Sequence, residues 1–176
     1  IRERPPQPNA FYIAAIDPAF RHDAFGFCIA HIEQDNKVVI DVLRRWPETG
    51  DGVKGQPLNP ATILDELLPY LKEYRCVEVV SDQYHIDTLQ QLAILRGFGI
   101  RQLTFTGSAK AEMYGNLQQL LRQHKIRLLD HEETLRELRS IEKKNMPGGT
   151  AKIGAPKGSH DDMATVVALA SHQCMW

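Results

Sequence analysis

The order of its hydrophobic segments is the feature that most constrains how this chain can fold. Three strand-like segments come first, and the turn-rich tetrapeptide Glu33-Gln34-Asp35-Asn36 joins the second segment to the third. Strands joined by so short a turn pair side by side in opposite directions, so this part of the chain predicts an antiparallel meander. The three predicted strands cover residues 11–17, 24–32 and 37–46.

Helices and strands alternate in the rest of the chain. Leucine and isoleucine side chains recur at helical spacing after Asn59-Pro60, although Pro69 lies inside this predicted helix. A strand that is followed by a helix and then by another strand returns to the same sheet in parallel. The sequence therefore predicts an α/β fold of the RNase H-like layout, with a mixed central sheet, helices on both faces, and the first and fourth strands side by side. The later strands are predicted at 76–81, 100–105 and 126–129, the later helices at 86–96, 109–123, 132–143 and after Gly158, and Gly- and Pro-rich loops at 47–60 and 145–158.

Length and composition fit one domain. With 176 residues, 43% of them hydrophobic, the chain can bury one core. We expect the Pro-rich residues 1–10 to be a linker remnant and residues 11–176 to be a domain excised from a longer protein, because the chain begins with Ile1. No apolar stretch reaches the roughly 18 residues that cross a bilayer, and no secretion signal opens the chain, so we expect a protein that is neither membrane-bound nor secreted. Cys28, Cys76 and Cys174 show no CxxC spacing, and we expect reduced thiols and no zinc site.

Acidic residues follow two predicted strands that are neighbours in this fold. Asp17 ends the first strand, Asp82 follows the fourth, and Asp161 and Asp162 begin the final helix. Carboxylate oxygens are ligands that Mg²⁺ and Mn²⁺ prefer, and two such ions about 3.5–4 Å apart can stabilise the attacking and leaving oxygens of a phosphodiester. The sequence therefore predicts a nuclease with Asp17, Asp82 and Asp162 as catalytic metal ligands and two Mg²⁺ or Mn²⁺ ions in the active site.

Each of these acids also has a purely structural explanation. Asp17 could begin a turn, Asp82 could cap a helix, and Asp162 could complete a capping box with Ser159 as N-cap. On a helical wheel, however, Asp162 lies near the apolar stripe of the final helix, whereas Asp161 lies nearly opposite to it. We therefore expect Asp162 to be the metal ligand from this helix and Asp161 to be a supporting or alternate ligand.

Two further residues lie close to these acids in the sequence. Asp23 lies six residues beyond Asp17, where it could approach a second metal ion or be an ordinary loop acid. His160 could orient a ligand carboxylate or contact the scissile phosphate, or it could be an exposed residue at the start of the helix.

Charge is unevenly distributed along the chain, although the net charge is only −1. Residues 1–95 contain 14 acidic and 9 basic side chains, whereas residues 96–157 contain 6 acidic and 12 basic ones. A basic flank beside an acidic, metal-binding pocket would attract double-stranded DNA, although solvated helix faces and loops produce the same asymmetry. The lysines expected to contact DNA are Lys110, Lys143, Lys144, Lys152 and Lys157.

Several short motifs follow one another over residues 11–170. They are Ile16-Asp17-Pro18 with Gly26, Val80-Ser81-Asp82, Lys110 with Tyr114 and Asn116-Leu117, Leu135-Arg136-Glu137-Leu138, and Ser159-His160-Asp161-Asp162. Together they resemble the C-terminal nuclease domain of the large terminase subunit of tailed double-stranded DNA phages. The resemblance implies an endonuclease that cuts concatemeric DNA during genome packaging in the cytoplasm of the infected bacterial cell.

The same resemblance implies partners for this domain. They are an N-terminal packaging ATPase domain, a small terminase subunit and a portal, although no GxxxxGK[ST] phosphate loop occurs in this chain. We expect the isolated domain to be a monomer.

The expected chemistry is hydrolysis of a phosphodiester by metal-activated water. Asp17 would bind both ions, Asp162 the ion that activates the water, and Asp82 the ion at the leaving 3′ oxygen. The products would be 5′ phosphate and 3′ hydroxyl ends, with weak sequence preference, because no base-reading motif is present in the sequence. An RNase H-like resolvase or an RNA:DNA hybrid nuclease would use the same three acids, and a non-catalytic DNA-binding or docking domain with this fold is a further alternative.

Overall fold

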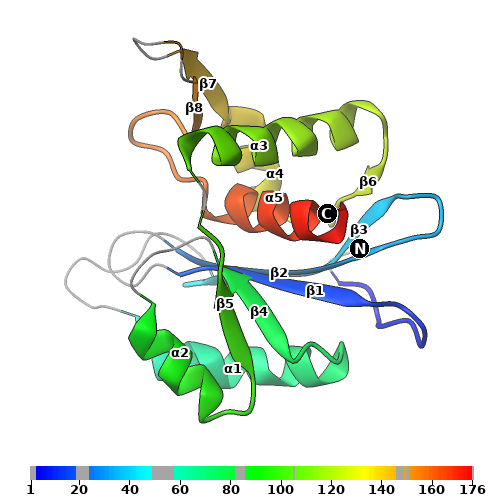
Figure 1. Ribbon diagram of the computed structural model, residues 1–176, viewed down its shortest axis with the longest axis vertical. Helices are drawn as coiled ribbons and strands as arrows, with labels where there is room; N and C mark the ends of the chain where they lie inside the picture. Colours follow the sequence, from blue (N-terminus) through cyan, green and yellow to red (C-terminus); the bar gives the residue numbers. More distant parts are fainter. Residues whose placement is uncertain are drawn as a thin grey trace.

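The described part of the chain forms one mixed sheet with helices on both faces and a separate hairpin (Figure 1). The computed structural model describes residues 3–18, 24–48, 58–81, 86–104, 106–145, 149 and 151–175. Within these residues, six strands form the central sheet in the order β5-β4-β1-β2-β3-β6, and β7 pairs with β8. The strands are β1 (Tyr12–Asp17), β2 (Phe25–Ile32), β3 (Val38–Trp46), β4 (Glu78–Ser81), β5 (Gly99–Gln102), β6 (Ile126–Arg127), β7 (Glu142–Asn145) and β8 (Ala151–Gly154).

The first three strands form the predicted antiparallel meander. In the pair of β1 with β2, Asp17 lies opposite Gly26. Strand β4 lies on the other side of β1 and runs parallel to it, with Ser81 opposite Ile16. The predicted neighbourhood of the first and fourth strands is therefore confirmed.

Two layers of helices cover the sheet, α1 and α2 on one face and α3, α4 and α5 on the other (Figure 1). Side chains alternate along a strand, so β1 contributes to both layers. Ala14 packs into the same core as Leu64 of the first layer. Ala15 packs into the same core as Val166 of the second layer, and Asp17, two residues further on, lies on that face as well. The helices are α1 (Pro60–Glu73), α2 (Asp87–Ile94), α3 (Gly107–Arg122), α4 (Glu132–Ser140) and α5 (Asp162–Met175).

Helix α5 lies between the sheet and α3 (Figure 1). Its residues from Asp162 to Ser171 are all buried, as expected for a helix that is apolar around most of its circumference. One polar contact links it to α3, because the hydroxyl groups of Tyr114 and Thr165 are 2.8 Å apart. The N-terminal part of α5 is therefore tied to α3 as well as packed on the sheet.

The helix predicted over residues 132–143 is shorter in the structure. Helix α4 ends at Ser140, and the residues after Ile141 form β7, which pairs with β8 in an antiparallel hairpin. The prediction of one loop over residues 145–158 is wrong for the same reason, because residues 151–154 form β8. Glutamate and lysine are good helix formers, but in β7 the pairing with β8 satisfies their backbone groups instead.

Other predicted elements differ only at their ends. The strand predicted at 126–129 is shorter in the structure, where β6 has two residues that pair with Val38 and Val39 at the start of β3. Helix α1 begins at Pro60 as predicted, where the Asn59 side chain accepts a hydrogen bond from the N–H of Ala61 at 3.0 Å. It continues through Pro69.

Residues 3–10 are the described part of the segment 1–10, which we expect to be a linker remnant, and they make hydrogen bonds with the rest of the domain. The backbone N–H of Arg4 donates to the carbonyl of Asp41 in β3 at 2.9 Å, and its guanidinium donates to the carbonyl of Ile40 at 3.2 Å. The carbonyl of Arg4 accepts a hydrogen bond from the Tyr74 hydroxyl. Hydrogen bonds therefore join the described part of this segment to β3 and to Tyr74 at the C-terminal end of α1.

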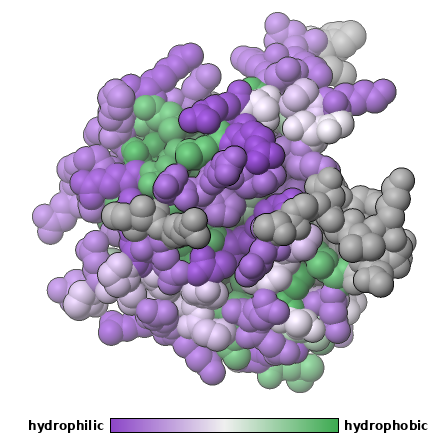
Figure 2. All heavy atoms as spheres, turned by 180° about the vertical axis from the view of Figure 1, so that it is seen from behind, coloured by the Kyte–Doolittle hydropathy of each residue, from purple (hydrophilic) through white to green (hydrophobic). Residues whose placement is uncertain are grey.

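The surface is mostly hydrophilic on the face shown in Figure 2, where hydrophobic side chains form separate patches. In the part of the chain that the structure describes, no helix combines the length and the hydropathy needed to cross a bilayer.

Candidate active site

Asp17 is the last residue of β1 and is only 6% exposed. Pro18 follows it and has no N–H group with which to extend the strand. Burial of an unpaired carboxylate is unfavourable, so a carboxylate at this depth requires polar or cationic neighbours.

Asp162 is the first residue of α5 and lies beside the end of β1. Its side chain is 7% exposed, and its Oδ2 accepts a hydrogen bond from the backbone N–H of Ala24 at 3.1 Å. Its carbonyl oxygen lies 3.0 Å from the place where a Cβ on Gly26 would stand. Because Gly26 is also the cross-strand partner of Asp17, Asp17 and the backbone of Asp162 are both neighbours of Gly26.

The start of α5 differs from the predicted one. The N–H of Thr165 donates to the carbonyl of Asp161 at 2.7 Å, which makes Asp161, rather than Ser159, the residue that precedes the helix. Asp162 is therefore at the first helical position. The capping box that required Ser159 as N-cap is not formed, so it does not explain the acid at position 162.

Asp161 points to a different part of the molecule. Its Oδ2 accepts a hydrogen bond from the N–H of Ala155 at 3.2 Å, directly after β8, and it lines a cavity of about 1080 Å³ between the start of α3 and the hairpin. Asp161 therefore holds the segment between β8 and α5, whereas Asp162 faces the entry to β2. His160, just before them, is half-buried.

The predicted DNA-contacting lysines gather around this cavity and the hairpin. Lys110 in the first turn of α3 and Lys152 in β8 line the cavity. Lys144 in β7 lies directly opposite Lys152 in the hairpin, and like charges at opposite positions destabilise a strand pair. Lys143 and Lys157 are exposed on β7 and after β8.

Two predicted ligands, Asp82 and Asp23, lie outside the described residues. Ser81, which precedes Asp82 in the sequence, ends β4 next to β1. Within the residues that the structure describes, no group of three or more His, Cys, Asp or Glu side chains is close enough to hold a metal ion. The described part of the candidate site thus consists of the pair Asp17 and Asp162.

Glu137 is a residue of this region that we did not predict as a functional one. It is 4% exposed, and its Oε2 accepts hydrogen bonds from the N–H groups of Met163 at 2.8 Å and Ala164 at 2.9 Å. Burial raises the pKa of Glu137 to about 7 although the bond from Ala164 lowers it, and the nearby charge of Asp162 raises it further. Its motif, Leu135-Arg136-Glu137-Leu138, shows an acid in a helix but does not indicate that the acid faces inward.

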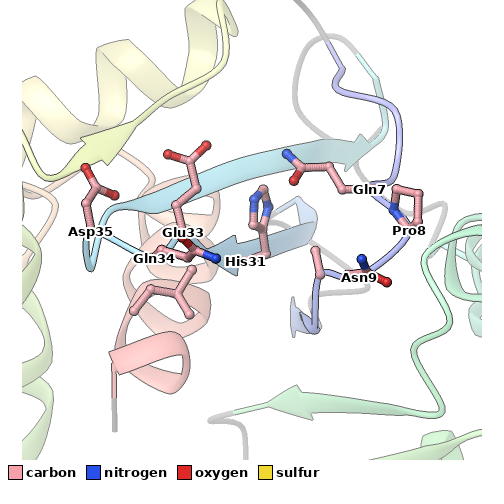
Figure 3. A pocket seen from close by; sticks show the side chains of 9 residues that line it. Gln7, Pro8, Asn9, His31, Glu33, Gln34 and Asp35 are labelled. Atoms are coloured by element: carbon pink, nitrogen blue, oxygen red, sulfur yellow. The ribbon is translucent and has the colours of Figure 1, made fainter.

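A second cavity lies at the opposite end of the sheet (Figure 3). It has a volume of about 530 Å³ and is lined by residues before β1, such as Gln7, and by residues around the turn between β2 and β3, such as His31 and Glu33. Nδ1 of His31 lies 2.6 Å from Oδ2 of Asp41. Asp17 is at the far end of β1 from this cavity, about 17 Å away at the usual rise per residue, so the two places are separate.

Comparisons with solved structures find phage terminase nucleases among the similar folds. The large terminase nuclease from thermophilic phage G20c matches with a TM-score of 0.79 and 20% identity, over 97% of this chain and 86% of that chain. Its forms with bound magnesium and with bound cobalt match with TM-scores of 0.77. The HK97 bacteriophage large terminase matches with a TM-score of 0.78 and 13% identity, over 97% of this chain and 41% of that chain. The yeast mitochondrial Holliday junction resolvase Ydc2 matches with a TM-score of 0.52 and 16% identity, over 99% of this chain and 80% of that chain.

These likenesses confirm the predicted RNase H-like fold and show that the chain shares this fold with large terminase nuclease domains. This chain spans less than half the length of the HK97 protein. No protein-family model matches the chain, and the search of curated proteins finds no match.

Proposed function

We propose that this chain is a metal-dependent endonuclease domain that cuts double-stranded DNA in the manner of a large terminase nuclease during packaging of a phage genome. The placement of Asp17 and Asp162 carries this proposal, because these two acidic residues from distant parts of the sequence are both neighbours of Gly26 at one end of the sheet. Asp82 is the proposed third ligand, since it directly follows Ser81 at the end of the strand next to β1.

The donor atoms of this pair suit a hard divalent cation. Asp17 and Asp162 offer carboxylate oxygens, which Mg²⁺ and Mn²⁺ prefer to sulfur ligands. Two bound ions would supply activation of a water molecule and stabilisation of the charge on the leaving 3′ oxygen. Asp17, Asp82 and Asp162 would hold the ions, with Asp161 and Asp23 as alternate ligands.

Neighbouring backbone groups orient the helix ligand. The hydrogen bond from the N–H of Ala24 selects one direction for the Asp162 carboxylate, and the missing side chain at Gly26 lets α5 approach the sheet. The proposed role of His160, which precedes the two helix acids, is to contact the scissile phosphate or to orient a ligand.

The lysines around the larger cavity offer a surface for the DNA backbone. Lys144 and Lys152 lie opposite each other in the hairpin, and a bound polyanion would offset the repulsion between their charges. Lys110, Lys143 and Lys157 would extend this surface. A packaging ATPase domain, a small terminase subunit and a portal are the proposed partners in packaging, in the cytoplasm of the infected cell.

Nicking of supercoiled plasmid in the presence of Mn²⁺ or Mg²⁺ tests the proposal. We expect Asp17→Asn and Asp162→Asn to lower the nicking rate by more than about 100-fold, because even residues that only support metal ligands affect activity by 10–100-fold. Binding of duplex DNA without divalent ions should persist in both variants. Asp35→Asn is the matched control, because Asp35 is exposed in the turn between β2 and β3, where its Oδ2 lies 3.3 Å from Nζ of Lys37.

Substrate comparison separates the alternatives. Faster cleavage of a four-way junction than of linear duplex would favour a resolvase, for which the likeness to Ydc2 is the supporting observation. Preferred cleavage of an RNA:DNA hybrid would favour a hybrid nuclease. A wild-type protein that binds DNA but cleaves none of these substrates with either metal would be a docking domain, and the nuclease proposal would be wrong.

A further inference from the structure

Glu137 connects α4 to the first turn of α5. Its Oε2 accepts the two hydrogen bonds from Met163 and Ala164, at 2.8 and 2.9 Å. N–H groups in the first turn of a helix have no partner within the helix, and a side chain just before the helix usually binds them. Here the acceptor comes from a different helix, 26 residues earlier in the sequence than Met163.

The place of this contact matters because Met163 directly follows Asp162. On the other side, the Asp162 carboxylate accepts its hydrogen bond from Ala24. The first turn of α5 is thus held from two directions, by α4 and by the start of β2. A shift of this turn would move the Asp162 carboxylate relative to Asp17, which is fixed at the end of β1.

Capping alone is a poor explanation for an acid at position 137. Oε1 of Glu137 is buried and has no hydrogen-bond partner among the described residues. Glu137 and Asp162 are only 4% and 7% exposed, and burial of a second carboxylate close to the first is unfavourable. A Ser or Thr at the N-cap would bind an N–H group of this turn without that cost.

We propose that Glu137 is a positioning residue of the nuclease site, which holds the first turn of α5 so that Asp162 stays beside Asp17. This inference rests on the proposed function. Glu137 acts through the backbone of Met163 and Ala164, and its effect is on how well the site binds metal ions.

Two substitutions test this role. Glu137→Gln keeps the shape and one acceptor oxygen, whereas Glu137→Ala removes both oxygens. Glu133→Gln is the matched control, because Glu133 lies one turn earlier on α4 and its partly exposed carboxylate is 3.7 Å from Arg136. The measurements are Mn²⁺ affinity by titration calorimetry, plasmid nicking, thermal unfolding, and hydrogen exchange of the Met163 and Ala164 amides by NMR.

We expect Glu137→Ala to weaken Mn²⁺ binding and nicking by about 10–100-fold, the range found for residues that orient metal ligands. Glu137→Gln should restore a large part of this loss, and Glu133→Gln should match the wild type. The amide protons of Met163 and Ala164 should exchange faster in Glu137→Ala. Duplex binding without metal should not change.

The proposal would be overturned if folded Glu137→Ala bound Mn²⁺ as tightly as the wild type does. It would also be overturned if the nicking rate of this variant fell only in proportion to the fraction of protein that is unfolded. If the alanine variant does not fold, the same comparison is made with Glu137→Met, which fills a similar volume but has no oxygen to accept the hydrogen bonds from Met163 and Ala164. A wild-type protein that binds Mn²⁺ but cleaves no nucleic acid would contradict the proposed function, while the Mn²⁺ titration would still decide the role of Glu137.

Discussion

Gly26 determines how closely α5 approaches the sheet at the candidate site. A Cβ at this position would lie 3.0 Å from the carbonyl oxygen of Asp162 and 3.2 Å from Cγ1 of Val166. Contacts this short require α5 to move, and α5 is packed on its far side as well. We expect Gly26→Ala to lower the free energy of unfolding by about 1–3 kcal/mol, the usual cost of overpacking, and to reduce nicking in the folded fraction.

Urea unfolding and plasmid nicking check this prediction against Gly115→Ala. Nothing lies within 4 Å of the place of a Cβ on Gly115, so alanine in this interior position of α3 should stabilise the protein by roughly 0.5–1 kcal/mol. Equal stability and activity of Gly26→Ala and the wild type would show that α5 does not pack this closely.

The two adjacent helix acids show what residue patterns can predict. The helical wheel separated Asp161 from Asp162, and the structure places their side chains against different segments. The predicted helix start was nevertheless wrong, because the first helical hydrogen bond depends on where the chain leaves β8. The motif around Glu137 did not indicate a buried acid, since an acid in a short amphipathic helix is normally exposed, and only packing against α5 makes it internal.

At the scale of elements, the β7–β8 hairpin is the part of the proposed DNA surface that can be tested alone. Lys144 and Lys152 are cross-strand neighbours. We expect Lys144→Gln and Lys152→Gln each to weaken duplex binding and to reduce the slope of log K against log salt by about 1, if each lysine contacts a phosphate. Thermal stability should stay the same or rise slightly, because a like-charge pair is removed.

Fluorescence anisotropy with a short duplex, without divalent ions, measures this slope. Lys72→Gln is the control, because Lys72 is exposed on α1, in the helix layer on the other face of the sheet. An unchanged slope in both hairpin variants would show that the duplex does not contact β7 and β8.

At the scale of the whole molecule, one sheet joins two cores that contain separate thiols. Cys76 belongs to the core on the α1 face, and Cys28 belongs to the core on the α5 face. Burial raises the pKa of the Cys76 thiol to about 12 and the pKa of the Cys28 thiol well above its usual value. We expect both thiols to react slowly with a disulfide reagent in the folded protein at about pH 8, because the thiolate is the reactive form.

Because both cores share the sheet, labelling of Cys28 and Cys76 should increase over the same range of urea concentration, as mass spectrometry of the labelled peptides would show. Separate midpoints would mean that the two helix layers unfold independently.

The raised pKa values of the thiols also make the stability of the protein depend on pH. The sign of this effect follows from the protons that the folded protein keeps and the unfolded chain loses. The contribution of Cys76 to stability is therefore present below its ordinary pKa of 9.0 and is lost as the pH rises towards about 12, and Cys76→Ala should reduce this slope.

The sequence by itself determined the order of the helices and of the strands in the central sheet, its mixed character, and the acids at the strand end and helix start. These follow from local rules, because hydrophobic periodicity, turn residues and crossover geometry act over short stretches of chain. Only the tertiary structure decided that residues 142–145 pair as a strand, that Gly26 receives the backbone of Asp162, and that Glu137 binds the first turn of α5. The physical reason is that such contacts join residues far apart in the sequence, and their free energy depends on packing and burial that exist only in the folded chain.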